Sequence, residues 1–196
     1  MEPVQCYLLD AYQREERGKL VFHLWGVSHN EVYHLIFENQ HAIFFIESEN
    51  FPQLCEPYRR DTSLRTFQGS QVSALYVPSQ IQAYQLKEKV ESLGHRTYES
   101  DVRAIDRFLM ERFIYAQFEF IGEKQRRSGY WQVNEPQIKA GQNTPTLSRL
   151  SLDIETSRRG ELYSIALHFL SENDERKLVL MMGAEGEKSP DFQIRY

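Results

Sequence analysis

The clearest pattern of hydrophobic and polar positions lies between residues 147 and 156. Three aliphatic residues alternate there with three polar ones: Leu150, Ser151, Leu152, Asp153, Ile154 and Glu155. A period of two predicts a β-strand with one apolar face and one polar face. The carboxylates of Asp153 and Glu155 are therefore expected to point the same way from a rigid strand.

Two further apolar runs follow this strand, at residues 162–170 and 177–182. The basic turn at 157–160 comes before the first of them. Apolar runs bounded by short polar turns are typical of consecutive antiparallel strands. The pattern predicts a three-stranded antiparallel meander whose first strand carries the two carboxylates.

The first 47 residues also have the pattern of strands. Strands are expected at 4–12, 19–27, 31–37 and 41–47, with short polar turns between them, one of them at residues 28–30. Four strands joined in this way are typical of a meander or a small barrel.

Eight aromatic residues lie along these four expected strands. One interpretation is a base-stacking platform for single-stranded nucleic acid, which also needs flanking basic residues. These strands contain few basic residues, and aromatic side chains favour strands in any case, so most of the eight are interpreted as core. They are Tyr7, Tyr12, Phe22, Trp25, Tyr33, Phe37, Phe44 and Phe45.

Two helices are expected between further extended segments. Ser79 is the expected N-cap of the first and Gly94 its C-cap, and a second helix is expected at residues 102–113. The buried side of the first helix is predicted from apolar residues at helical spacing: Ile81, Tyr84, Leu86, Val90 and Leu93. Extended segments at 63–77, 95–99, 116–123 and 130–139 complete the pattern.

Together these elements predict an α+β fold with a mixed, β-rich N-terminal domain. The basic residues 124–127 are expected at a hairpin tip. Residues 140–145 have turn-forming residues and no apolar periodicity, which predicts a linker. The expected domains are therefore 1–145 and 146–196.

Composition narrows the class of protein. Hydrophobic residues make up 41% of the 196 and charged residues 26%, which is ordinary for a soluble globular domain. No apolar run is long enough to cross a bilayer, and no secretory signal is evident. The two cysteines, Cys6 and Cys55, form no disulfide framework, so reduced thiols and a cytoplasmic location are expected. A net charge of −5 argues against strong, sequence-independent electrostatic binding to the phosphates of nucleic acid.

Four histidines, at positions 23, 29, 34 and 41, raise the question of a zinc site. They fall on different expected strands and turns and lack paired ligand spacing. A structural or surface role is the preferred interpretation.

The pair Asp153 and Glu155 is the best candidate for chemistry. Two carboxylates side by side repel each other unless a cation lies between them, and hard ions such as Mg²⁺ prefer oxygen ligands. Two-metal phosphoryl chemistry uses such carboxylates to hold ions beside the scissile phosphate. The alternative is that Asp-x-Glu is simply the solvent-facing side of a half-buried sheet.

The segment Ser151–Thr156 resembles the first exonuclease motif, D-I-E-T, of the family B DNA polymerases. Residues 159–165, 98–103 and 107–114 resemble bacterial members of that family. The resemblance covers about the last hundred residues, and the first ninety agree only in general layout. It implies that the opening antiparallel strands of a ribonuclease H-like 3′→5′ proofreading exonuclease domain follow the N-terminal domain. It also implies catalytic, metal-binding roles for Asp153 and Glu155.

The resemblance further implies a Mg²⁺-dependent DNA polymerase of replication or repair as the parent protein. Its partners would be template and primer 3′ end, deoxynucleoside triphosphates bound by other domains, and, as a candidate, a sliding clamp; no membrane is expected. The remaining exonuclease and polymerase motifs would lie beyond residue 196, so the chain is expected to be an inactive fragment. Self-association is expected through incompletely covered apolar residues: Leu162, Ile165, Leu178 and Leu180.

Two other functions stay open. One is a non-catalytic nucleic-acid-binding or scaffold domain in which the carboxylates have no role. The other is a different two-metal nuclease of ribonuclease H-like fold. Downstream polymerase motifs would distinguish the parent polymerase from both.

Overall fold

A computed structural model describes residues 2–29, 31–182 and 193–195. The chain divides into two compact units, Met1–Thr144 and Pro145–Tyr196, and each is described by itself. The division falls at the end of the segment expected to be a linker. The sequence also predicts a polar loop at 183–191, which lies outside the described residues, as does position 30 in the expected turn at 28–30.

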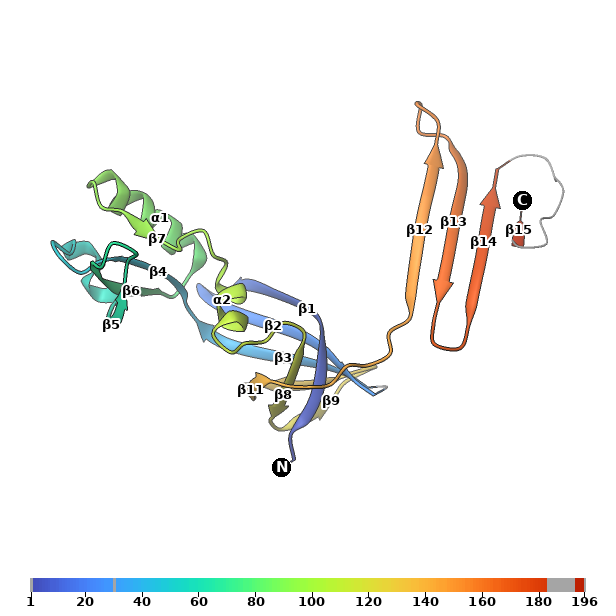
Figure 1. Cartoon of the computed structure of the whole chain (residues 1–196), viewed down its shortest axis with the longest axis horizontal. Coiled ribbons are helices and arrows are strands. Elements are labelled where there is room, and N and C mark those ends of the chain that lie inside the picture. Colours follow the sequence, from blue (N-terminus) through green and yellow to red (C-terminus); the bar gives the residue numbers. More distant parts are fainter. Residues whose placement is uncertain (1, 30, 183–192, 196) are drawn as a thin grey trace. The chain divides into compact units, whose positions relative to one another are not determined.

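The first unit contains a seven-stranded sheet with the order β11-β8-β1-β2-β3-β10-β9 (Figure 1). All neighbours are antiparallel except β10, which runs parallel to β3. Its strands are β1 (Val4–Glu16), β2 (Lys19–Ser28), β3 (Glu31–Gln40), β8 (Gln117–Ile121), β9 (Lys124–Arg126), β10 (Trp131–Asn134) and β11 (Gln137–Ala140).

Two predictions near the end of this unit are wrong. The single strand expected at 130–139 is two strands, because Glu135 has a φ of 47° and redirects the chain before Pro136. β10 pairs with β3, whereas β11 pairs with β8. The expected hairpin tip at 124–127 contains a short strand, β9, which pairs with β10.

A second sheet in this unit has the order β5-β6-β4-β7 (Figure 1). Its strands are β4 (Ala42–Glu47), β5 (Arg59–Arg65), β6 (Gln71–Val77) and β7 (Thr97–Tyr98). The predicted four-strand meander is therefore corrected. The first three strands are consecutive neighbours, but after His41 the chain enters this second sheet, where β4 pairs with β6 and β7.

Three helical segments connect these strands: a 3₁₀ helix (η1, Gln53–Tyr58), α1 (Gln80–Ser92) and α2 (Ala104–Met110). The predicted N-cap is confirmed, since the Ser79 hydroxyl accepts a hydrogen bond from the Gln82 backbone N–H at 3.3 Å. Gly94 directly follows the C-cap Leu93 with a φ of 84°, a conformation that glycine adopts without strain.

The predicted buried side of α1 is only partly right. Leu86 and Val90 are buried together with Ala83, which completes their helical spacing. The other three apolar residues of the expected side face away from the core: Ile81, Tyr84 and Leu93 are 59%, 51% and 59% exposed. The buried side of α1 therefore differs from the predicted one, because it includes the small residue Ala83 and excludes these three larger residues.

One core joins both sheets and both α-helices of the first unit. Phe22 of β2 packs against Phe108 of α2 with ring centroids 5.3 Å apart. The core interpretation is confirmed for most of the eight aromatic residues, because Phe22, Tyr33, Phe37, Phe44 and Phe45 are buried. Both free cysteines are buried as well, and burial raises the pKa of Cys6 to about 12 and of Cys55 to about 11.

The second unit is a four-stranded sheet with the order β12-β13-β14-β15. Its strands are β12 (Arg149–Thr156), β13 (Leu162–Leu170), β14 (Glu175–Met181) and β15 (Gln193–Arg195). The first three form the predicted antiparallel meander, and β15 runs parallel to β14. Within the described residues, no helix of either unit is long and apolar enough to cross a membrane.

Candidate functional site

Asp153 and Glu155 lie on β12 and share one face of the sheet. In the antiparallel register, Asp153 is opposite Ala166 and Glu155 is opposite Ser164, a step of two residues without interruption. A step of two places both carboxylates on the same side. The register shifts immediately afterwards, between Glu155 and Thr156, so a bulge ends the regular pairing beside the second carboxylate.

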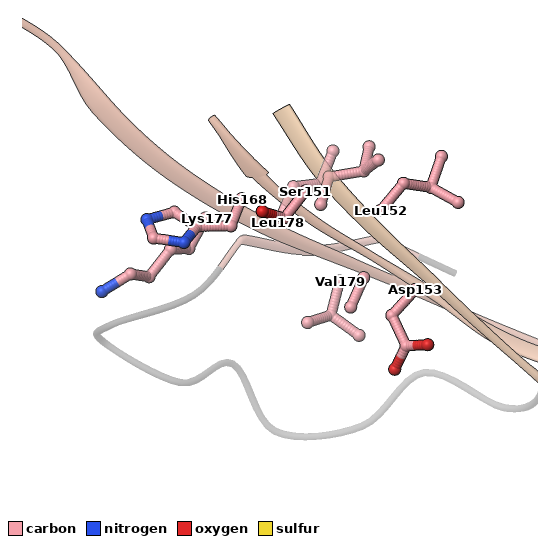
Figure 2. A pocket seen from close by; sticks show the side chains of 9 residues that line it. Ser151, Leu152, Asp153, His168, Lys177, Leu178 and Val179 are labelled. Atoms are coloured by element: carbon pink, nitrogen blue, oxygen red, sulfur yellow. The ribbon is translucent and has the colours of Figure 1, made fainter. Parts of the chain in front are cut away.

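The same face continues across the neighbouring strands. Val179 of β14 is opposite Ala166, while His168 and Lys177 are opposite each other two residues further along. Figure 2 shows Asp153 and Val179 on one side of the strands and Leu152 on the other. A pocket of about 350 Å³ is lined in part by Asp153, His168 and Lys177.

The two basic side chains beside Asp153 already have a partner. His168 Nε2 lies 2.8 Å and Lys177 Nζ 3.1 Å from the same Glu175 carboxylate oxygen. Hydrogen bonds from His168 first and Lys177 second lower the pKa of Glu175. The Asp153 and Glu155 carboxylates, in contrast, are exposed. Their oxygens are thus available to an external cation.

The donor chemistry of this pair fits Mg²⁺, but the number of ligands does not complete a site. Carboxylate oxygens are the ligands that Mg²⁺ prefers, and the ion requires near-octahedral coordination. Across residues 2–29, 31–182 and 193–195, no group of three or more His, Cys, Asp or Glu side chains could hold a metal ion. Asp153 and Glu155 could therefore contribute to a metal centre without forming one by themselves.

The opposite face of the same strands is apolar. Leu152 is opposite Leu167, which is opposite Leu178, and Ile154 forms the next such row with Ile165 and Leu180. Leu150, Leu152 and Ile154 are 61%, 57% and 51% exposed. Of the residues expected to be incompletely covered, Leu162 is 39% exposed and Ile165, Leu178 and Leu180 are half-buried.

The structure brings two of the four histidines together, which sequence spacing did not reveal. His23 Nδ1 and His34 Nε2 are 2.9 Å apart on the buried part of a stack that runs from Tyr12 through both imidazoles to Trp25. Burial lowers the pKa of both histidines, that of His34 to about 4. This proximity follows from the register of β2 and β3, in which Trp25 is opposite His34 and His23 is two residues from Trp25 on the same face.

Comparison with known proteins confirms the resemblance to a bacterial DNA polymerase. The chain is 27% identical over 199 aligned residues to DNA polymerase II of Escherichia coli (strain K12), a match that covers 97% of this chain. The chain spans about a quarter of that relative's length (24%). No family model matches the chain.

Similarities to solved structures are weaker. An Ifi202 HINa domain in complex with 20-bp double-stranded DNA has a TM-score of 0.30 and 11% identity, covering 95% of this chain and 78% of that one. A murine DNA-binding protein bound to double-stranded DNA has a TM-score of 0.29 and 6% identity, covering 95% of this chain and 80% of that one. Scores this low do not define a shared fold.

Proposed function

We propose that this chain is the N-terminal part of a DNA-directed DNA polymerase of family B with 3′→5′ proofreading exonuclease activity. The observation that carries the proposal is the D-I-E-T segment on β12, where Asp153 and Glu155 share one exposed face. Similarity to DNA polymerase II along 97% of the chain supports it. In this proposal residues 1–145 form the N-terminal domain and 146–196 begin the exonuclease domain.

The second unit has features that suit the start of a ribonuclease H-like domain. Its first three strands are antiparallel and consecutive, and the first of them bears the carboxylates. Within the described residues β12 is an edge strand of its sheet. An edge offers unpaired backbone N–H and C=O groups to a further strand. The exposed apolar face likewise requires a cover, because burial of Leu150, Leu152 and Ile154 would stabilise the domain.

Asp153 and Glu155 are proposed to hold catalytic Mg²⁺ beside the 3′-terminal phosphodiester of the primer. When bound, such ions activate a water molecule and stabilise the leaving 3′ oxygen. The rigid strand fixes the two carboxylates relative to each other, so the ligands need little reorganisation when the substrate arrives. Template, primer and nucleotide binding would require other domains of the parent, and a sliding clamp is a candidate partner.

The isolated chain is proposed to be inactive. Two carboxylates from one strand hold an ion with incomplete ligation, which provides neither the geometry nor the charge neutralisation that phosphodiester cleavage needs. The further ligands would come from elements outside these residues. This distinguishes the proposal from a complete two-metal nuclease within residues 1–196.

The test uses the full-length parent protein and a primer with a mismatched 3′ end. Substituting Asp153→Ala together with Glu155→Ala should reduce release of the 3′ nucleotide by roughly 100-fold or more, since even outer-shell metal partners account for 10–100-fold. Primer extension should persist. The matched control is Glu172→Ala with Asp174→Ala, which removes two carboxylates beside the β13–β14 turn.

Two results would contradict the proposal. One is unchanged excision by the Asp153 and Glu155 double variant. The other is robust degradation of single-stranded DNA by the 196-residue chain alone in Mg²⁺ or Mn²⁺, lost on Asp153→Ala, because it would show that a complete site exists within this chain.

A further inference from the structure

The sheet β5-β6-β4-β7 has an aromatic outer face. Phe45 of β4 is directly opposite Tyr98 of β7, and Tyr76 of β6 is opposite Ile43. Residues 43 and 45 share a side because they are two apart on one strand. The opposite side of β4 carries Phe44, which belongs to the main core. The outer face therefore places one aromatic ring on each of three neighbouring strands.

Each of these rings has an arginine over it. The Arg60 guanidinium carbon lies 3.9 Å from the ring centroid of Tyr76, that of Arg107 lies 5.2 Å from Phe45, and that of Arg96 lies 5.2 Å from Tyr98. The arginines come from β5, α2 and the residue before β7, so their assembly depends on the fold. We name this set of six residues the aromatic–arginine face.

A pocket of about 350 Å³ adjoins this face. Phe45 and Tyr98 line it together with Arg65 at the end of β5 and Phe67 of the β5–β6 turn. Phe67 is a fully exposed aromatic side chain, with a relative exposure of 108%. An exposed aromatic ring beside an arginine and an apolar pocket is typical of a surface that stacks on a planar ligand.

Arg107 is a largely buried, ion-paired arginine at this face with one hydrogen-bond donor that is not satisfied. Its side chain is only 11% exposed, and it forms ion pairs with Glu99 and Glu111. Its Nε is buried and has no hydrogen-bond partner. A buried donor without a partner is costly unless a ligand or another acceptor satisfies it. Because this Nε has no accessible surface, the exposed side chains of Arg60 and Arg96 are the ones that can reach a phosphate oxygen.

We propose that the aromatic–arginine face and the adjoining pocket bind single-stranded DNA. Bases would stack on the exposed ring of Phe67 and on the rings of Tyr76 and Tyr98, while Arg60 and Arg96 move from the rings to phosphates. Stacking on aromatic side chains combined with basic residues along the backbone is the general mode of single-strand recognition. The choice of DNA rests on the proposed polymerase function, for which this face would hold the unpaired template.

Shape favours a single strand over a duplex. Arg107 is already paired with Glu99 and Glu111, which leaves Arg60, Arg65 and Arg96 for phosphates. The rings are partly covered by arginines and can stack only on bases that are not already paired and stacked in a duplex.

The test measures binding of fluorescein-labelled oligothymidylate, twelve nucleotides long, to the 196-residue chain by fluorescence anisotropy. Phe67→Ala should raise the dissociation constant roughly fivefold or more, as expected for the loss of one stacked base. Arg60→Gln and Arg96→Gln should each lower the slope of log affinity against log salt by about 0.7, one phosphate contact of a single strand. These side chains lie at the surface, so the fold should survive.

Matched controls exist in the same unit. Tyr115→Ala removes another exposed aromatic ring, 89% exposed, outside this face. Arg14→Gln removes an arginine that lies 5.1 Å from the ring centroid of Tyr12 in the other sheet. Neither should change the dissociation constant by more than twofold. Emission from Trp25 and Trp131, both in the seven-stranded sheet, should be unchanged in every variant and so reports retained folding.

Several outcomes overturn the proposal. Equal dissociation constants for Phe67→Ala and Tyr115→Ala would do so, as would duplex DNA or an RNA oligonucleotide binding more tightly than the DNA single strand. Failure of the polymerase proposal would look different. In that case the parent would show no primer extension or no Asp153-dependent excision. Phe67-dependent binding of oligothymidylate by the 196-residue chain is measured separately and does not depend on that result.

Discussion

The two units use similar strand patterns but differ in what covers the apolar face. In the first unit, β2 and β3 are consecutive antiparallel strands, and Leu24 and Leu35 are completely buried. In the second, β12 and β13 are paired in the same way, yet Leu152 is 57% exposed. Helices and a second sheet pack on the first core, whereas the described part of the second unit has only strands.

This difference shows that alternating apolar and polar residues identify the apolar face of a strand, but not whether other elements pack on that face. The alternation around Asp153 places the carboxylates and the leucines on opposite sides, as the register of β12 and β13 bears out. Burial, in contrast, depends on elements that are distant in the chain. The covered unit has polar and aromatic residues on its outer faces, while the apolar side of the second unit is exposed within the described residues.

The largest expected effect comes from truncating a covered leucine. Leu35→Ala should lower the free energy of unfolding of the first unit by roughly 3–5 kcal/mol, because it removes transfer free energy and leaves a cavity. The measurement is urea unfolding followed by tryptophan emission. Both tryptophans, Trp25 and Trp131, lie in the first unit, so this signal reports that unit alone.

The matched variant is Leu152→Ala in the second unit. Its side chain is already more than half exposed, and the tryptophan signal does not come from its unit. Unfolding of the second unit is therefore followed by circular dichroism, and its free energy of unfolding should fall by less than about 0.5 kcal/mol, as for most surface substitutions. Similar losses from Leu35→Ala and Leu152→Ala would contradict the comparison of covered and uncovered faces.

A smaller effect is expected from acid in the first unit. His34 has a folded-state pKa of about 4, below the ordinary value, because burial disfavours its charged form and His23 and Arg14 lie nearby. The stability associated with neutral His34 is thus complete above the unfolded pKa of about 6.5. It is lost as the pH falls from there toward 4, since the unfolded chain binds the proton first.

Between pH 7 and pH 5 the expected loss is roughly 1–2 kcal/mol, which lowers the Tm by a few degrees. Circular dichroism melts across this range, compared with those of His34→Gln, measure it. The variant should show a shallower dependence on pH. His29→Asn is the control, because His29 is exposed and has a φ of 52°, a conformation that asparagine tolerates. Parallel pH profiles for wild type and His34→Gln would rule out this role.

The sequence predicted local features better than the arrangement of strands. The N-cap at Ser79, the strand at 162–170 and the antiparallel meander follow from hydrogen-bonding side chains and alternation, which are local, and the structure confirms them. The transfer of β4 to a second sheet and the split of residues 130–139 depend on long-range pairing. A single sequence contains no direct signal for such pairing.

The residues proposed to bind ligands show the same division. Asp153 and Glu155 could be proposed from one segment, because a two-residue step determines their common face. The aromatic–arginine face could not, since Phe45 lacks basic neighbours in the sequence and receives Arg107 from a helix about sixty residues away. Because the strands of the first 47 residues contain few basic residues, the sequence favours a core role for their aromatic residues over a base-stacking platform.

The smallest expected effect on stability, but a clear effect on association, comes from a polar substitution on the uncovered face. The chain should self-associate through the rows that contain Leu152 and Ile154, because burying each exposed leucine contributes roughly 1.5–3 kcal/mol. Leu152→Gln should raise the dissociation constant of the self-associated form by roughly tenfold or more, measured by sedimentation velocity across a concentration series.

The control is Leu9→Gln, which changes a leucine of similar exposure, 51%, on β1 of the covered unit. Because that leucine is isolated from any apolar row, its substitution should leave association unchanged. A monomer at all concentrations, or equal effects of Leu9→Gln and Leu152→Gln, would show that the uncovered face does not bind a second copy.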